Sequence, residues 1–229
     1  MKKILFAMAL IALFAAGAAA AQEEIPETEI FGGYSLFKMG ASNENFLTFQ
    51  EGLYDGGGGW KAGSTSFFLK RGGTGSVAFN INEYFSIVTD IRYNQGNIIE
   101  GTFEFVSPET QTLVQTPFVI GIKNVSAMAG PRISFRKERG TAFFHALAGL
   151  DYWRLNGDFT IAGEKRSETG DKFGPGVAIG GGVDINVSEK FAVRVIQADY
   201  YLARQMERLT KNVNLSFGIV FRIGEKVLR

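Results

Sequence analysis

The chain has 229 residues, is rich in glycine (29) and phenylalanine (21), contains five prolines and is 21% charged. Because glycine is a poor helix former and phenylalanine favours pleated surfaces, this composition predicts an all-β fold. The lack of cysteine excludes disulfides and thiolate metal sites, and a net charge of +1 gives no electrostatic basis for binding nucleic acid.

The N-terminal segment has the order of a secretory signal peptide. Two lysines precede an apolar run over residues 4–14, and small residues follow up to Ala21. The run is too short to span a bilayer, so it predicts export and cleavage before Gln22. We therefore expect a signal peptide over 1–21 and one domain over 22–229. No later segment offers about 20 consecutive apolar residues, so the exported domain is either soluble or a membrane barrel.

Apolar and polar residues then alternate with a period of two in short segments, which is typical of β-strands. Such segments predict eight strands, near residues 30–38, 75–81, 85–93, 125–135, 144–152, 177–185, 191–195 and 213–221. An even number of antiparallel strands predicts an eight-stranded up-and-down transmembrane β-barrel.

The connections between these strands alternate in length. Short turns are expected near residues 82, 138 and 188, and long connections at roughly 40–72, 96–120, 153–173 and 203–210. Bacterial outer-membrane barrels have short periplasmic turns and four or more long extracellular loops, so the asymmetry predicts the orientation. β-like pieces at 102–106 and 112–121 indicate a hairpin around Ser107 that extends beyond the membrane.

Aromatic residues distinguish a lipid-facing barrel from a soluble barrel of the lipocalin type, which would show the same alternation. Phenylalanines flank the short turns at positions 79, 85, 135, 144, 191 and 221, and further aromatics stand at the ends of the long loops at Tyr93, Tyr152, Trp153, Tyr200 and Tyr201. Two aromatic girdles around an apolar band favour the membrane barrel.

Three short segments resemble the OmpA-like and OmpX-like family of small outer-membrane β-barrels. They are residues 130–135 (GPRISF), 180–184 (GGGVD) and 191–200 (FAVRVIQADY). The resemblance implies an eight-stranded barrel in the cell outer membrane, inserted by the barrel assembly machinery, with roles that range from envelope structure to adhesion.

The polar face of the predicted strands carries charges of both signs, Asp90, Arg92, Arg132, Asp151, Asp184 and Arg194. The turn near Ser188 predicts that Asp184 and Arg194 are diagonal neighbours inside the barrel. Because charges in a narrow lumen must be paired or hydrated, we interpret them as structural ion pairs that also plug the core. A conducting or gating role is the alternative.

Three other features could in principle have a function. His145, the single histidine, faces inward. No serine or acidic partner for it stands out in the sequence, so a satisfied core histidine is favoured over the catalytic histidine of a lipid-A-modifying barrel. Gly56 to Gly59 lacks the context of a phosphate loop and predicts a flexible tip. Gly180 to Gly182 lies within a strand and is expected to relieve crowding.

Gln197 and Asp199 break the pattern, since their parity places them on the lipid face. Either a β-bulge shifts the register, or both lie above the hydrocarbon.

The sequence names no substrate, cofactor or metal. The leading hypothesis is a non-enzymatic envelope protein that displays four loops for structural or recognition purposes. A narrow pore is the second hypothesis, and a lipid-A-modifying enzyme is the third. Expected partners are outer-membrane lipid and lipopolysaccharide, the assembly machinery and a surface ligand, with the protein a monomer.

Overall fold

The computed structural model describes residues 25–40, 51–54, 58–65, 68–106, 112–161, 164–205 and 208–226. The described residues form strands, and none forms a helix long and apolar enough to cross a membrane. The strands, in chain order, are β1 (Ile25–Lys38), β2 (Glu51–Tyr54), β3 (Gly58–Thr65), β4 (Phe68–Leu69), β5 (Arg71–Asn80), β6 (Phe85–Val106), β7 (Leu113–Lys137), β8 (Gly140–Ile161), β9 (Glu164–Asn186), β10 (Phe191–Gln205) and β11 (Arg208–Lys226).

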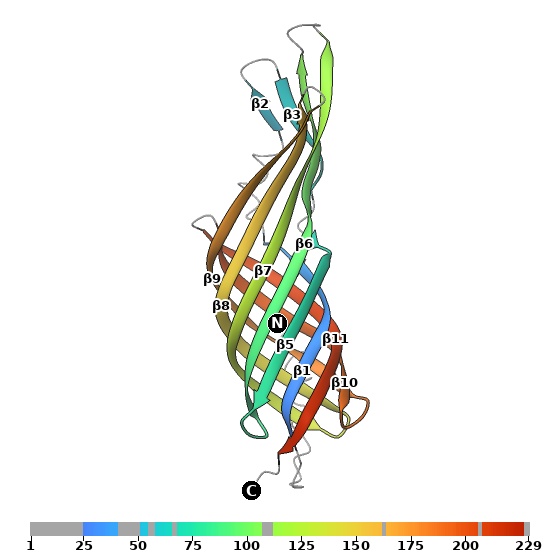
Figure 1. Ribbon diagram of the computed structural model, residues 1–229, viewed down its shortest axis with the longest axis vertical. Coiled ribbons are helices and arrows are strands. Elements are labelled where there is room, and N and C mark those ends of the chain that lie inside the picture. The colour runs from blue at the N-terminus through green and yellow to red at the C-terminus, as the bar shows by residue number, and fades with distance from the viewer. Residues whose placement is uncertain are drawn as a thin grey trace, which may run out of the picture.

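Eight of these strands close into a ring. β1 pairs with β5, each strand from β5 to β11 pairs with the next, and β11 pairs back with β1, always antiparallel. Figure 1 shows the strands strongly tilted around the barrel. Closure leaves no free edge in the ring, which is what a strand protein needs inside lipid. The predicted eight-stranded antiparallel barrel is therefore confirmed.

The two ends of the barrel differ as predicted. Short connections at 81–84, 138–139 and 187–190 lie at one end, which we call the short-turn end. At the opposite, long-loop end, β6 to β9 continue far beyond the ring as one twisted sheet (Figure 1). β3 pairs with the upper part of β6, β2 pairs with β3, and β4 pairs with the end of β1.

Several predicted loops are strands instead. The extended hairpin around Ser107 is confirmed, because β6 and β7 pair from Phe85 and Ile133 to Val106 and Leu113, with one register shift between Asn97 and Ile99. The segment 153–173 was expected to be a loop, but β8 and β9 pair through it up to Ile161 and Glu164. This prediction was wrong because β8 still alternates there with its polarity reversed, while β9 is exposed and mostly polar on both faces over 165–172, and these polar residues were taken for a loop.

Smaller corrections affect the remaining connections. The 203–210 connection is largely strand, since β10 runs to Gln205 and β11 starts at Arg208. The first connection contains β2, β3 and β4 in its described parts. Gly58 and Gly59 belong to β3, whereas Gly56 and Gly57 lie outside the described residues. The predicted signal peptide also lies outside them, so its cleavage stays a prediction.

The alternation of faces places the side chains as expected. Outward positions beside the short turns carry exposed Phe79, Phe85, Phe135, Phe144, Phe191 and Phe221. At the long-loop end Tyr93 and Tyr200 also point outward, but Trp153 and Tyr201 are 5% and 1% exposed and lie inside the barrel. The prediction that these two belong to the outer girdle was wrong.

Candidate functional site: the barrel interior

The interior of the barrel is lined by the polar face of its strands. All six charges predicted to face inward, Asp90, Arg92, Arg132, Asp151, Asp184 and Arg194, are buried. Ion-pair contacts add five residues to them: Glu29, Arg136, His145, Asp199 and Arg222. The lumen therefore holds two networks of paired charges, while Asp151 bonds to neutral side chains, in keeping with the need to pair charges away from water.

Arg194 on β10 is the centre of one part of this group. Its guanidinium donates to both carboxylate oxygens of Asp184, at 2.8 and 3.1 Å, and to Oε1 of Gln197 at 2.7 Å. Residues 184 and 194 are paired directly across the strands, so the predicted diagonal relation was wrong by two residues. The turn is centred one residue later than predicted, on Glu189 instead of Ser188, which shifts the register by two residues.

Two aromatic rings hold Arg194 from both sides. Its guanidinium carbon lies 4.1 Å from the ring centroid of Phe31 and 4.3 Å from that of Phe143. A desolvated cation between aromatic faces is stabilised by both ring quadrupoles. Small residues make room for this packing, because a Cβ at Gly182 would lie 2.7 Å from the Phe143 ring. The expectation that Gly180 to Gly182 relieves crowding is thereby confirmed.

Asp199 joins a second part of the group. Its carboxylate pairs with Arg92 at 2.8 Å, accepts from Gln197 at 2.9 Å and lies 2.6 Å from Nε2 of His145. Arg92 also pairs with Asp90. His145 is thus a core histidine with a carboxylate partner. The alternation of the sequence did not reveal this partner, because without a bulge the parity of Asp199 places it on the lipid face.

A β-bulge in β10 brings Asp199 inside. The register of β10 against both neighbours shifts between Arg194 and Ile196 or Gln197, and Val195 and Ile196 both point outward. From Gln197 onward the parity is reversed, so Gln197 and Asp199 are each 1% exposed. Of the two alternatives left open by the sequence, the bulge is correct.

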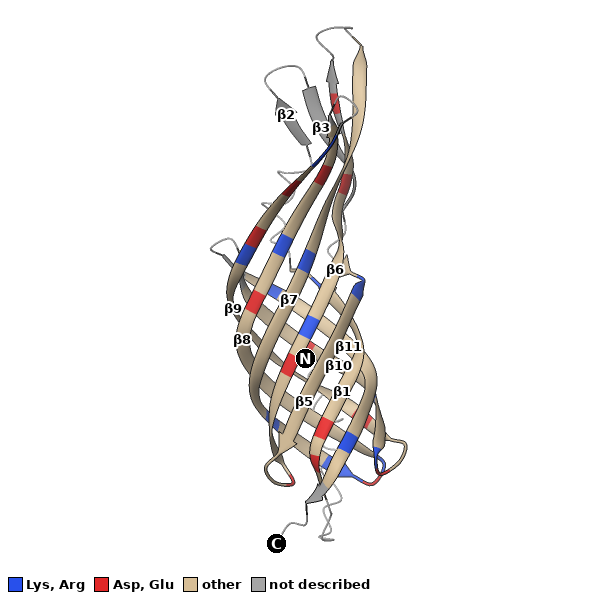
Figure 2. Cartoon of the chain, viewed as in Figure 1, with Lys and Arg blue, Asp and Glu red and all other residues tan. Residues whose placement is uncertain are grey.

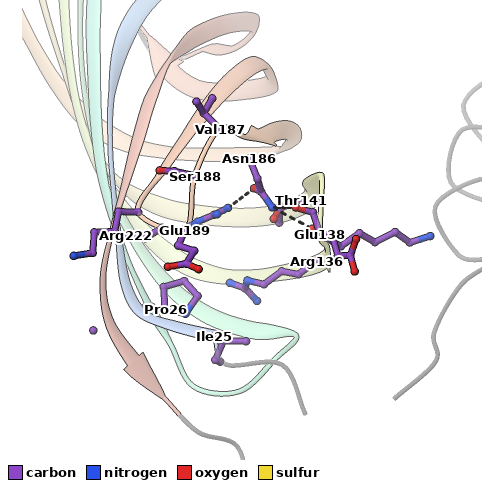
Figure 3. A pocket seen from close by; sticks show the side chains of 13 residues that line it. Ile25, Pro26, Arg136, Glu138, Thr141, Asn186, Val187, Ser188, Glu189 and Arg222 are labelled. Carbon is purple, nitrogen blue, oxygen red and sulfur yellow. Dashed lines mark hydrogen bonds between the residues drawn. The ribbon is translucent and has the colours of Figure 1, made fainter. Parts of the chain in front are cut away.

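The short-turn mouth of the lumen is rich in arginine. Glu29 on β1 pairs with Arg132 and, at 3.3 Å, with Arg136, and Arg222 approaches the same carboxylate at 3.9 Å. Sequence analysis missed Glu29 because the glycine pair that follows it blurred the start of the first strand. Figure 3 shows Arg136, Arg222 and Asn186 around a cavity of about 540 Å³ that opens beside these turns.

Apolar side chains close the lumen toward the long-loop end. The ring of Phe37 meets those of Trp153 and Tyr201 edge-on, each at 5.6 Å between centroids. Leu69 from β4 and Ile98 from β6 are buried in the same cluster. Nε1 of Trp153 donates to Asp151, which ties this cluster to the polar lumen. The described interior is therefore filled at both levels.

The described residues offer limited chemistry. They contain no group of three or more metal-ligating side chains. In the described part of the chain, the hydrogen-bond partner of His145 is the Asp199 carboxylate, and no serine or threonine hydroxyl is bonded to it. The observed contacts match those of a packed structural interior.

Comparisons with known proteins agree with this architecture. The family model described as outer membrane protein beta-barrel domain matches residues 6–222. No curated protein matches the chain in sequence. Among solved structures, Ail, the attachment invasion locus protein of Yersinia pestis, is 15% identical with a TM-score of 0.46, covering 86% of this chain and 99% of its own.

Two further structures are similarly distant. Neisserial surface protein A is 13% identical with a TM-score of 0.45, covering 86% of this chain and 97% of its own. OprG of Pseudomonas aeruginosa is 9% identical with a TM-score of 0.40, covering 88% and 97%. The match of the family model over nearly the whole chain, together with the closed ring of eight strands, shows that this protein belongs to the outer-membrane β-barrel domain family and so to the bacterial outer membrane.

Proposed function

We propose that the protein is a non-enzymatic envelope protein whose closed barrel carries an extracellular β-sheet for surface recognition. The observation that carries this proposal is the continuation of β6 to β9 as a paired sheet beyond the ring (Figure 1). We propose further that the chain is exported with cleavage before Gln22, is inserted by the barrel assembly machinery and functions as a monomer.

Strand length supports display rather than simple anchoring. β1 has 14 residues, whereas β7 has 25 and β9 has 23. A membrane-spanning strand needs only about 9–11 residues. At about 3.3 Å per residue, the excess in β7 amounts to roughly 45 Å measured along the tilted strand. Holding so much paired backbone in one sheet gives a rigid surface, which suits recognition better than an irregular loop.

The filled lumen favours a closed barrel over the alternative of a narrow pore. Buried ion pairs occupy its polar part, and the cluster of Phe37, Trp153 and Tyr201 closes the long-loop side. An eight-stranded barrel has an interior just wide enough for such side chains. The contacts of His145 with the Asp199 carboxylate and the Phe143 ring likewise support a structural role over lipid modification.

The proposal is tested on the full mature chain and on a variant with both long hairpins shortened. The cuts fall at the register pairs Asn97 with Gly121 and Asn156 with Thr169, each joined by a two-residue turn. We expect both proteins to show no single-channel conductance in planar bilayers and to migrate differently on gels before and after boiling. Stable conductance steps from the full chain would favour the pore.

Orientation is tested on intact cells with single cysteines. A cysteine at Glu164, at the tip of the β8–β9 hairpin, should react with a membrane-impermeant maleimide, and one at Glu138 in a short turn should not. Labelling of Glu138 alone would place the sheet in the periplasm and end the proposal of surface recognition.

A further inference from the structure

The outward face of β5 to β9 changes character in successive rows as the strands leave the membrane. The aromatic row contains Tyr93, Val125, Tyr152 and Phe173, which are paired across neighbouring strands. Two residues further along each strand, the basic row contains Arg71, Gln95, Lys123, Arg154 and Asp171. The next row, the amide row, contains Asn97, Gly121, Asn156 and Thr169.

We propose that a groove over the basic and amide rows binds the phosphorylated saccharide headgroup of a glycolipid in the outer leaflet. The groove has a volume of about 410 Å³, and most of its lining residues come from these two rows. This inference rests on the proposed function, because it assumes that the sheet faces the cell exterior, and it names the partner bound at the base of that sheet.

The basic row supplies charge for phosphate. Arg154 is paired with Asp171 at 2.8 Å, but among the described residues neither Arg71 nor Lys123 is paired with a carboxylate, and both are exposed. Figure 2 shows blue positions side by side on β7 and β8, and another at the upper end of β5, where the sheet leaves the ring. Arg71 and Lys123 are two strand spacings apart, roughly 10 Å. A disaccharide, or a headgroup with two phosphates, could therefore contact both cations at once.

The amide row supplies groups for hydroxyls. Thr169 donates to Oδ1 of Asn156 at 3.5 Å, so the amide nitrogen of Asn156 has no partner among the described residues. In the row beyond, Ser167 donates to Asp158 at 2.6 Å, and the other carboxylate oxygen remains an acceptor. Gly121 lies between these side chains and adds none of its own, which leaves space above the sheet. Amides, carboxylates and hydroxyls over a flat floor are suited to a saccharide.

The position of the groove selects a lipid over a soluble saccharide. Directly below it the aromatic row begins the apolar face, which continues with Ala127 and Leu150 and would accommodate acyl chains. Contacts join the rows: the Tyr93 hydroxyl donates to Gln95 at 2.8 Å, and the Arg154 guanidinium lies 5.7 Å from the Tyr152 ring centroid. A headgroup in this groove would thus keep its chains in the bilayer.

The test uses the full mature protein, refolded in detergent and incubated with diphosphoryl lipid A, monophosphoryl lipid A, phosphatidylglycerol or the deacylated diphosphoryl disaccharide. Retained ligand is counted by native mass spectrometry. The variant Arg71→Gln with Lys123→Gln removes the two unpaired cations. The matched control, Lys137→Gln with Lys190→Gln, removes two cations from the short-turn end. Gel shift on boiling verifies that each variant is folded.

We expect diphosphoryl lipid A to bind most tightly and the groove variant to weaken it about tenfold, since charge-assisted contacts are of this size, with the control unchanged. Equal weakening in the control, equal binding of phosphatidylglycerol, or no change in the groove variant would overturn the proposal. Equal binding of the deacylated disaccharide would make the ligand a soluble saccharide instead. Because conductance and cysteine labelling are measured separately, a failure here leaves the proposed function standing.

Discussion

Two parts of the same strands, the part in the membrane ring and the part that extends beyond it, follow opposite rules. In the membrane part of β8, Ala148 and Leu150 point outward to lipid, and Asp151 points inward. Beyond Trp153 the outward residues are Asn156 and Asp158, while Leu155 and Phe159 face the inner, apolar cluster. The strand and its pairing continue unchanged, but the solvent outside changes from lipid to water, and the polarity of the two faces is exchanged.

This comparison explains why the polar lumen ends where it does. Inside the membrane the outer face is apolar, so the interior must hold the polar residues and pair them. Above the membrane the sheet folds as a soluble protein does, with a hydrophobic core on its inner face that includes Phe37, Leu69 and Trp153. The closed end of the lumen is therefore the lower part of that core.

The largest expected effect tests whether charges inside the barrel must be paired. Arg194→Ala leaves Asp184 buried without its partner and empties the space between two aromatic rings. Because both side chains are at most 3% exposed, we expect a loss of about 3–5 kcal/mol in the free energy of unfolding. Reversible urea unfolding in lipid or detergent measures it.

The double variant is the control for that result. Arg194→Ala with Asp184→Ala should recover part of the loss, because neither charge is then stranded. Unchanged stability in both single variants would mean that the two residues do not depend on each other, and a new conductance at unchanged stability would indicate a gate.

The next prediction compares the same kind of substitution, to arginine, on the outward face of β8 inside the membrane and beyond it. Ala148→Arg places a charge on the lipid face near the middle of the apolar band and should cost about 2–4 kcal/mol. Asn156→Arg, eight residues further along the strand on the same face, should change stability by less than about 0.5 kcal/mol. The same unfolding assay compares them. Equal costs would show that Asn156 also lies in the hydrocarbon.

A smaller effect is expected from filling the crowded interior. A Cβ at Gly180 would overlap the Asp199 carboxylate and the Ala198 carbonyl oxygen, whereas a Cβ at Gly157, in the sheet beyond the ring, meets nothing within 4 Å. Gly180→Ala should cost about 1–3 kcal/mol through overpacking. Gly157→Ala should be neutral or slightly stabilising, and a destabilisation of similar size there would refute the contrast.

The smallest effect concerns the exposed ion pair of Arg154 and Asp171 beyond the ring. The hydrogen bond from Arg154 lowers the pKa of the Asp171 carboxyl. A carboxylate whose pKa is depressed on folding adds stability above its unfolded pKa and loses it as the pH falls through the folded pKa, so the contribution disappears in acid. Titration of the Asp171 carboxyl carbon by NMR should give a higher pKa in Arg154→Gln. An unchanged pKa would show that the exposed pair does not persist in solution.

The sequence by itself determined the barrel. Alternation of faces, the positions of the short turns and the phenylalanines beside them predicted the eight strands, their order and the end from which the sheet extends. It also placed Asp90, Arg92, Arg132, Asp151, Asp184 and Arg194 inside. These features are local, since a two-residue period and a turn can be recognised without knowing what lies opposite.

Only the tertiary structure decided which of these residues meet. A bulge of one residue in β10 carries Asp199 from the lipid face to His145, and a register shift of two residues at a turn sets Arg194 directly opposite Asp184. The extension of β8 and β9 was mistaken for a loop because period two predicts a strand but not the solvent on each side. Register and closure are fixed by contacts between distant strands, and one residue of slip exchanges the two faces.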